Sequence, residues 1–423
     1  MTSEVLMLNK NAVVIAADSA VTTGRDPHPR YSKAANKIFD LSLYGNVAVT
    51  IFAAAEIDRV PWELALKQFR QHDATNTQRP KLDDYVGALV TYLECNPTLF
   101  PAALQSDLLK RRFFQAALFV LQRVGALFPD FINDSKTTAE RVTAWANGFA
   151  VLAQELGGLT FAPPLTQPVH QSILAQSAVL QAELGPDLAN SKEYLQADVT
   201  QLTTLAIESL VKIPFEFLNY TGLVFAGYGA DEIFPSFVHV EIYGHIGGTL
   251  LWKEINRYSI THDNDALILP FAQSSMIDRF TDGFDQSLNL SISLGSKESF
   301  SGIISDLTAS GIVIPSAVSD PILAQRHSDF MAAWRHKNWE ANFHPLRRVL
   351  NSLSVPEMGH LAASLLVLEE LRERVTSPSE SIGGPIDVAA ITKAEGLVWL
   401  KRKHFFEPEL NQRYVGRINS DYT

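Results

Sequence analysis

The second residue of the chain is a threonine, Thr2, and a threonine in this place can do chemistry. Methionine aminopeptidases remove the first residue when the next one is small, so we expect the mature chain to begin at Thr2. Such a first residue has a hydroxyl, which can act as a nucleophile, and a free amine, which titrates near pH ~8 and can accept the proton of the hydroxyl. Nucleophile and base would then lie on one residue.

A nucleophile of this kind also needs a cation and an acid beside it. The cation lowers the pKa of the amine and stabilises the alkoxide, the acid holds the cation in place, and backbone N–H groups bind the oxyanion. Asp18 ends the apolar run AVVIAAD, which a tight turn at Lys10-Asn11 would return to the start of the chain. Lys37 opens the next apolar run, and Thr22 is placed to offer backbone groups to an extended peptide.

The elements that must position these residues are indicated by the periodicity of the apolar residues. Runs rich in β-branched residues predict strands in the first 56 residues, again from TGLVFAGYG to DALILPFA, and in a closing hairpin formed by PIDVAAI and GLVWLKRK. Apolar residues at intervals of three and four predict helices over about 60–217 and 272–376. This order predicts an α+β fold in which two sheets lie between helical layers.

The composition limits the classes of protein to which the chain can belong. Of its 423 residues, 46% are hydrophobic and 19% charged, which is typical of a globular protein with a large core. A net charge of -11 argues against nucleic acid or an anionic membrane as partner, since both bind clustered Lys and Arg. No segment approaches the ~20 apolar residues of a membrane span, so we expect a cytoplasmic protein. The single cysteine, Cys95, excludes a disulfide within one chain and is expected to be buried.

The sequence has only weak signals for a metal or a phosphate. HDND at 262–265 is more typical of a polar turn than of a metal site. The glycine segments GYG at 227–229 and GHIGG at 244–248 lack the residues that follow in phosphate-binding loops. We therefore expect neither a metal nor a cofactor.

The N-terminal block resembles the proteasome β-type subunits, which belong to the N-terminal-nucleophile hydrolase superfamily. Members start the mature chain with Thr, continue into a segment of the form VVxAADSxxT, and place a Lys before Ile or Val on the next strand. This chain has Thr2, then VVIAADSAVT at 13–22, then Lys37-Ile38, and the interval from Thr2 to Asp18 is that of the family. LVFAGYGADEIFPSFVHVEIYG and SIGGPIDVAAITKAEGLVWL are similar to later segments of the same family.

The resemblance implies a four-layer αββα N-terminal-nucleophile hydrolase sandwich with two helical insertions. The division that follows from it is 1–96 for the N-terminal part of the core, 97–217 for a helical insertion, 218–289 for core strands and a helix, 290–355 for a second helical insertion, and 356–423 for the C-terminal helix and closing hairpin.

The resemblance also implies roles for individual residues. Thr2 is the expected nucleophile, its amine the base, Lys37 the cation and Asp18 the partner that orients Lys37. The remaining site residues are carried over from the family pattern: Thr22, Phe52, Ala53 and Ala54 for substrate binding, and Gln273, Ser274 and Ser381 in support.

Several of these positions depart from the family pattern. Phe52 and Ala53 stand where the family usually has paired glycines, the first of which supplies its N–H to the oxyanion. Gln273 and Ser274 stand at a Gly-Ser-Gly segment, and Ser381 is one substitute for a missing acid. These changes bear on catalysis more than on the fold.

The function expected from the resemblance is that of a threonine peptidase or amidohydrolase, acting on a peptide or protein substrate. Such a protein is expected to form a homo-oligomer, for which a ring is one form, and to work with an ATPase on folded substrates. Two alternatives stay open: a catalytically inactive scaffold or binding subunit, and a small-molecule amidase of the same superfamily.

Overall fold

A computed structural model describes residues 3–23, 30–42, 46–72, 78–191, 194, 196–376, 383–404, 406–413 and 416. The chain combines two five-stranded antiparallel sheets with helices, so the prediction of an α+β fold is confirmed. The predicted nucleophile Thr2 and the predicted supporting residue Ser381 lie outside the described residues.

The first sheet contains the most N-terminal of the described strands. Its order is β12-β1-β2-β13-β14, with bounds Ala266–Ala272, Ser3–Asn9, Ala12–Ala17, Asp387–Thr392 and Gly396–Lys401. β1 and β2 pair as the predicted hairpin about Lys10-Asn11. The side chain of Asn9 holds this turn, because its Oδ1 accepts hydrogen bonds from the backbone N–H groups of Asn11 and Ala12.

The second sheet has the order β11-β10-β9-β6-β5. The bounds of these strands are Thr249–Ser259, Ser236–Ile246, Thr221–Gly227, Val47–Ala53 and Ile38–Asp40. The antiparallel strands expected in the first 56 residues are therefore divided between two sheets, because β1 and β2 join the first and β5 and β6 the second. Two short ribbons accompany the sheets: β3 (Val21–Thr23) with β4 (Arg30–Ser32), and β7 (Glu56–Ile57) with β8 (Val60–Pro61).

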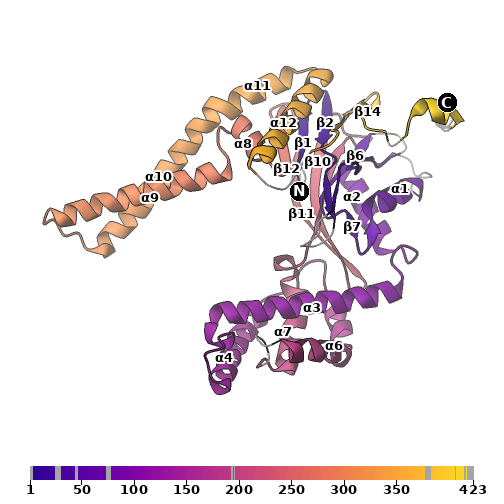
Figure 1. The fold of residues 1–423 in the computed structure, drawn as a ribbon. Helices are drawn as coiled ribbons and strands as arrows, with labels where there is room; N and C mark the ends of the chain where they lie inside the picture. Colours follow the sequence, from indigo (N-terminus) through magenta and orange to yellow (C-terminus); the bar gives the residue numbers. More distant parts are fainter. Residues whose placement is uncertain are drawn as a thin grey trace.

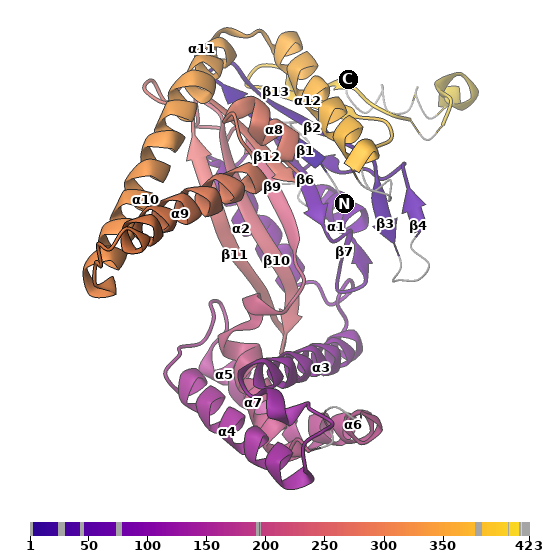
Figure 2. The same ribbon diagram turned by 60° about the vertical axis from the view of Figure 1, so that its left-hand side comes forward.

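The two sheets pack face to face, and helices cover their outer faces (Figures 1 and 2). Along β1, Leu6 and Leu8 face the second sheet, whereas Val5 and Met7 face helices, as the alternation of side chains in a strand requires. α8 (Ser275–Thr281), α11 (His344–Ser352) and α12 (Val355–Thr376) lie on the first sheet. α1 (Trp62–His72) and α2 (Leu82–Glu94) lie on the second.

A separate group of helices lies at one end of the sheets. Its members are α3 (Ala102–Leu127), α4 (Thr138–Gly157), α5 (Gln167–Leu174), α6 (Ser177–Asn190) and α7 (Val199–Lys212). They bury a hydrophobic core of their own, to which Phe113 and Val120 of α3 and Leu205 of α7 contribute. α3 also contacts β10, which connects the group to the second sheet.

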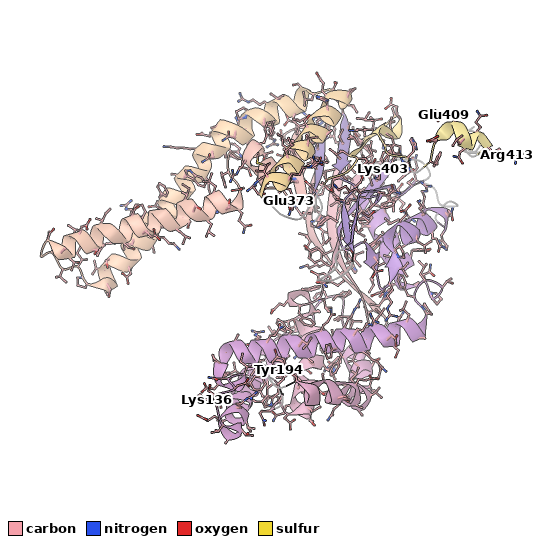
Figure 3. The ribbon with its side chains drawn as sticks, viewed as in Figure 1. Lys136, Tyr194, Glu373, Lys403, Glu409 and Arg413 are labelled. Atoms are coloured by element: carbon pink, nitrogen blue, oxygen red, sulfur yellow. The ribbon has the colours of Figure 1, made fainter. Side chains whose placement is uncertain are left out.

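A helical hairpin projects from the other end of the sheets. It consists of α9 (Gln286–Ala309) and α10 (Ser316–Asn338) and is called the arm below. In Figure 1 the arm and the α3–α7 group extend toward the same side of the sheets. No side chain of α9 is buried, and Figure 3 shows the side chains of the arm standing out around it.

The composition gave expectations about Cys95 and about membrane-spanning segments. Cys95 ends the last turn of α2 on its outer side and is exposed, so the expected burial of this thiol is wrong. Among the described residues, no helix has both the length and the apolar character that a membrane crossing needs.

Candidate active site

The structure brings Asp18 and Lys37 together at the start of β1. Asp18 follows the last residue of β2, and Lys37 precedes the first residue of β5, so the two side chains come from different sheets. Nζ of Lys37 lies 2.5 Å from Oδ1 of Asp18, and both side chains are almost inaccessible to solvent, at 4% and 2% exposure. Because water hardly reaches either group, this ion pair is screened far less than one on the surface.

Backbone N–H groups complete the surroundings of the Asp18 carboxylate. Oδ1 also accepts a hydrogen bond from the backbone N–H of Ser3 at 3.1 Å, and Oδ2 accepts from Ala20 at 3.2 Å and from Gly383 at 3.1 Å. Among the described residues, each group that hydrogen-bonds the two oxygens is a donor, so the carboxylate acts as the acceptor in all of these contacts. The contact with Ser3 places the acid directly beside the residue that follows Thr2.

Gln273 and Ser274 lie near the same end of β1. The hydroxyl of Ser3 donates to the backbone oxygen of Gln273 at 3.0 Å. Ser274 is the N-cap residue of α8, and its hydroxyl donates to Asp278 at 2.7 Å. Gln273 is thus one hydrogen bond away from Ser3, whereas the hydroxyl of Ser274 is engaged within its own helix.

Phe52, Ala53 and Ala54 end β6, and their side chains differ in orientation. The ring of Phe52 is buried between the two sheets, 5.7 Å from the ring of Phe271 and 5.4 Å from that of His239. It lies over Gly222, where a Cβ would approach the ring to 2.2 Å. The ring of Phe52 is therefore occupied in packing between the sheets, and the role of this residue in substrate binding stays a prediction.

Ala53 has the backbone conformation that a glycine would adopt with ease. Its φ is 68°, in the left-handed region, which costs an alanine roughly 1 kcal/mol. The next carbonyl is held in place, since Oγ1 of Thr221 donates to the oxygen of Ala54 at 3.1 Å while accepting from Nε1 of Trp62 at 2.8 Å. Ala53 thus adopts a left-handed conformation at a position where the family pattern has a glycine.

The remaining predicted site residues are Thr22, Thr2 and Ser381. Thr22 lies in the β3–β4 ribbon, where its backbone pairs with Tyr31. Thr2 and Ser381 lie outside the described residues, and within two positions after each comes a residue whose backbone N–H donates to Asp18, namely Ser3 and Gly383. The catalytic roles assigned to all of these residues remain predictions.

A buried acid at the site, Glu4, was missed by the sequence reasoning. Glu4 has no exposed surface, and its Oε2 accepts a hydrogen bond from the hydroxyl of Thr50 at 2.7 Å. Burial raises the pKa of Glu4 to about 8, against the smaller opposing effects of the Lys37 charge and the Thr50 hydroxyl. A signal was present in the sequence, because Glu4 directly precedes the apolar run VLML and lies on the same face of the strand as Leu6 and Leu8.

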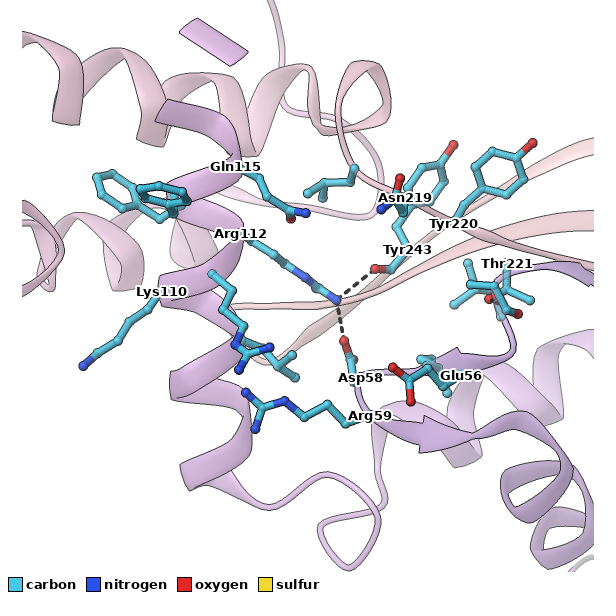
Figure 4. Close-up of a pocket in the computed structure, with 18 of the residues that line it drawn as sticks. Glu56, Asp58, Arg59, Lys110, Arg112, Gln115, Asn219, Tyr220, Thr221 and Tyr243 are labelled. Carbon is cyan, nitrogen blue, oxygen red and sulfur yellow. Dashed lines mark hydrogen bonds and ion pairs between the residues drawn. The ribbon is translucent and has the colours of Figure 1, made fainter. Parts of the chain in front are cut away.

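A cavity of about 580 Å³ begins at Ala54 and extends between α3 and β10 (Figure 4). Polar and charged groups on its wall include Glu56, Arg59, Lys110 and Tyr220. Neither Asp18 nor Lys37 lines it. The cavity thus adjoins the predicted substrate-binding segment but not the ion pair itself.

A buried ionic network forms one side of this cavity and joins α3 to the sheet. Asp58 accepts hydrogen bonds from the backbone N–H of His245 at 2.8 Å and lies 2.7 Å from the Nδ1 atom of the same residue. The guanidinium of Arg112 binds Asp58 and the backbone oxygen of Tyr243 (Figure 4), and it also binds the backbone oxygen of His245. Burial acts to raise the pKa of Asp58, but His245 and Arg112 outweigh it and hold the pKa below its ordinary value.

Within the part of the chain that the structure describes, no three His, Cys, Asp or Glu side chains are grouped in a way that would hold a metal ion.

Comparison with known proteins gives only distant likenesses. No protein-family model matches the chain, and no curated protein matches it. Among solved structures, the helical assembly of the Anbu complex from Pseudomonas aeruginosa is 10% identical, with a TM-score of 0.31, over 99% of this chain and 95% of that one. Anbu from Hyphomicrobium sp. strain MC1 is 10% identical with a TM-score of 0.28, over 99% and 96%, and its Gly-1 mutant is 10% identical with a TM-score of 0.27, over 100% and 96%. TM-scores as low as these support no inference about function, so the function has to be argued from the residues of the site.

Proposed function

We propose that this chain is a threonine hydrolase of the N-terminal-nucleophile superfamily, similar to proteasome β-type subunits, and that it cleaves amide bonds in peptides. One observation carries the proposal. A single carboxylate oxygen of Asp18 binds both the ammonium of Lys37 and the backbone N–H of Ser3, so a buried cation is fixed beside the residue that follows Thr2. This is the arrangement that a first-residue nucleophile needs.

The proposed reaction begins with the removal of Met1. The amine of Thr2 accepts the proton of the Thr2 hydroxyl as the oxygen attacks the substrate carbonyl, and the positive charge of Lys37 stabilises the alkoxide. The C–N bond then breaks, the leaving amine takes the proton, and an ester remains on Thr2. Water, activated by the same amine, hydrolyses the ester and regenerates the hydroxyl.

The oxyanion of this reaction would bind backbone N–H groups of the segment Phe52-Ala53-Ala54. Support comes from the left-handed conformation of Ala53, because strained backbone that the surrounding structure enforces is common at functional sites. The buried ring of Phe52 and the bond from Thr221 to Ala54 fix this segment from both sides. A rigid donor costs no reorganisation in the transition state.

The fold assignment belongs to the same proposal. The observed stacking of helices, sheet, sheet and helices is the arrangement expected of an αββα N-terminal-nucleophile hydrolase. On this assignment, the α3–α7 group falls within the insertion at 97–217, and most of the arm falls within the one at 290–355.

A small-molecule amide is the second candidate substrate. The cavity that begins at Ala54 has a volume of about 580 Å³, which lies within the range of about 300–1,000 Å³ typical of small-ligand pockets. A peptide that extends past the ion pair and a compact amide that fills the cavity are the two cases to distinguish.

We further propose that copies of this chain assemble through the arm. Apolar side chains are exposed on both of its helices, including Leu290 and Ile303 on α9 and Val318 and Ile322 on α10. Exposed apolar side chains in such number are typical of a surface that another protein covers. An ATPase partner remains an expectation from the family resemblance alone.

The first experiment on this proposal is the mass of the intact protein before and after treatment with a threonine-directed β-lactone. We expect a chain without Met1 that gains one acyl group, and peptide mapping should place this group on Thr2. Retained Met1, or acylation at another residue, would refute the proposed mechanism. A chain that lacks Met1 but gains no acyl group would instead support the inactive scaffold.

Matched variants separate the nucleophile from the residues around it. Thr2→Ala should abolish acylation, and Thr2→Ser should retain it, since serine keeps both the hydroxyl and the amine. Peptide and small-amide substrates compared on the same preparation then decide between the two candidate substrates.

A further inference from the structure

Glu4 is an acid in a place where an apolar side chain is expected. It lies on β1 with the same orientation as Leu6 and Leu8, so it points into the space between the two sheets. Within its own sheet, Glu4 pairs with Ala17 of β2 on one side and with Phe271 of β12 on the other. No part of Glu4 is exposed to solvent.

The hydrogen bonds of Glu4 are incomplete. Oε2 accepts from the hydroxyl of Thr50, which reaches across from β6 of the other sheet, at 2.7 Å. Oε1 is buried and has no hydrogen-bond partner among the described residues. A buried carboxylate oxygen without a donor is costly, and protonation removes that cost, so the contacts favour the neutral acid.

The register of the strands places Glu4 beside the ion pair. Glu4 pairs with Ala17, the residue before Asp18, and Thr50 pairs with Ile38, the residue after Lys37. The Glu4–Thr50 hydrogen bond thus spans the two sheets one position away from the Asp18–Lys37 contact. The charges of Lys37 and Asp18 both act on Glu4.

Other titratable groups near Glu4 are accounted for. In the second sheet, Val224 of β9 pairs with Thr50 on one side and with His239 of β10 on the other. Burial lowers the pKa of His239, so its ring is uncharged near neutral pH. Asp387 of β13 lies opposite Ala17 and is paired with Lys403, which Figure 3 labels. Lys37 and Asp18 are left as the charged groups nearest to Glu4 in the described part of the chain.

We propose that Glu4 is a positioning residue for the threonine hydrolase reaction: its neutral form leaves the pair of Lys37 with Asp18 undisturbed, and its ionised form adds a further negative charge beside this pair and switches the site off. The inference rests on the proposed function, since it concerns the charge that Lys37 presents to Thr2. With Glu4 neutral, the pair Asp18–Lys37 carries no net charge and the ammonium acts fully on the nucleophile. With Glu4 ionised, two negative charges face one positive charge, and the stabilisation of the alkoxide is lost.

The test is the rate of Thr2 acylation by the β-lactone, measured by intact mass at pH 7.0 and pH 9.5 on the full-length chain. Glu4, with a pKa of about 8, is ionised at the upper value, and in the wild type this opposes the gain in rate that deprotonation of the Thr2 amine brings. Glu4→Gln keeps the size and accepts from Thr50 but cannot ionise. The ratio of the rate at pH 9.5 to that at pH 7.0 should therefore be about tenfold or more higher in Glu4→Gln than in the wild type.

The control is Asp40→Asn, which removes another largely buried acid with a raised pKa, at the far end of β5. Its ratio should equal that of the wild type. Equal ratios in Glu4→Gln and the wild type, with Thr2 reactive in both, would overturn the inference about Glu4 and leave the proposed function intact. Absence of reaction at Thr2 in both proteins at both pH values would overturn the proposed function and the inference together.

Discussion

The backbone N–H of Gly383 donates to the carboxylate of Asp18 across 365 positions of sequence, at 3.1 Å. The same carboxylate binds Lys37 and Ser3, so segments from the beginning and the end of the chain meet on one side chain. A site assembled in this way depends on the whole fold, and its parts cannot be altered independently.

Lys37→Met should abolish most of the reactivity of Thr2 and also destabilise the chain. We expect acylation to slow by about 100-fold or more, because the cation that stabilises the alkoxide is gone. The free energy of unfolding should fall by about 3–5 kcal/mol, since Asp18 is left as an unpaired buried charge. Both quantities are measured on one preparation, by intact mass after β-lactone treatment and by urea unfolding.

Lys10→Met provides the control for this variant. Lys10 lies at the other end of the β1–β2 hairpin, where it donates to the backbone oxygen of His262 at an exposed site. Its replacement should change the free energy of unfolding by less than about 0.5 kcal/mol. A Lys37→Met protein that reacts as fast as Lys10→Met would show that Lys37 takes no part in catalysis.

Glu4→Gln should make the stability of the chain less dependent on pH. Because burial raises the pKa of Glu4 from 4.5 to about 8, the folded chain keeps a proton that the unfolded chain releases. The associated stability is fully present below pH 4.5 and is lost as the pH rises through about 8. At about 1.4 kcal/mol per pKa unit, this loss is on the order of 4–5 kcal/mol.

Urea unfolding at several pH values measures this effect. The advantage of Glu4→Gln over the wild type should be absent near pH 4.5 and should grow until about pH 8. Parallel stability curves for the two proteins would mean that Glu4 does not change its protonation on unfolding. This measurement requires no catalytic activity.

Ala53→Gly should behave differently from Ala54→Gly. Ala53 has a φ of 68°, so glycine relieves strain there and offsets the entropy that it adds to the unfolded chain. Ala54 is not among the residues with positive φ, and glycine there brings only the entropic cost. The free energies of unfolding of the two variants should differ by about 1–2 kcal/mol in favour of Ala53→Gly. Equal values would argue against a strained Ala53.

Arg112→Met should loosen the junction between α3 and the sheet. The guanidinium holds the carboxylate of Asp58 and two backbone oxygens in a buried place, so its loss should cost about 3–5 kcal/mol of unfolding free energy. Arg111→Met, which alters the exposed neighbour on the same helix, should cost less than about 0.5 kcal/mol. Hydrogen exchange should show faster exchange around residues 242–246 in Arg112→Met only, and equal exchange in both variants would contradict the role of the network.

Substitution of apolar side chains on the arm should reduce the size of the assembly. Leu290→Lys together with Leu294→Lys places two charges on α9, at positions that are 57% and 50% exposed. Ile233→Lys is the control, since Ile233 is 79% exposed but lies in the connection between β9 and β10. Light scattering should give a smaller mass for the double variant alone. An unchanged mass would show that the arm does not mediate self-association.

Local structure could be predicted from the sequence because it follows from periodicity. Two apolar runs separated by the turn residues Lys10-Asn11 predict a hairpin, and β1 and β2 pair as this pattern predicts. The closeness of Asp18 to the start of the chain is a consequence of that hairpin. Lys37 was harder, because its place depends on which sheet receives β5; its position at the start of an apolar run made it a candidate, and the family resemblance added its role as the cation.

Other features depend on long-range packing that no local pattern reveals. The donation from Gly383 to Asp18 and the contact of Asp58 with His245 join segments that are 365 and 187 positions apart. The orientation of Phe52 is set by Gly222 on the neighbouring strand, which leaves room for the ring. Glu4 gave a local signal, an acid in an apolar run, but its meaning depends on Thr50 in the opposite sheet.

The position of β1 inside its sheet also limits how the protein can be handled. β12 and β2 flank this strand on its two sides, and Ser3 and Glu4 have no exposed surface. An affinity tag fused ahead of Thr2 would convert the free amine of this residue into an amide, and the proposed base would be lost. An affinity tag should therefore be placed at the C-terminus. A protein with a tag fused ahead of Thr2 is expected to purify normally but not to react with the β-lactone.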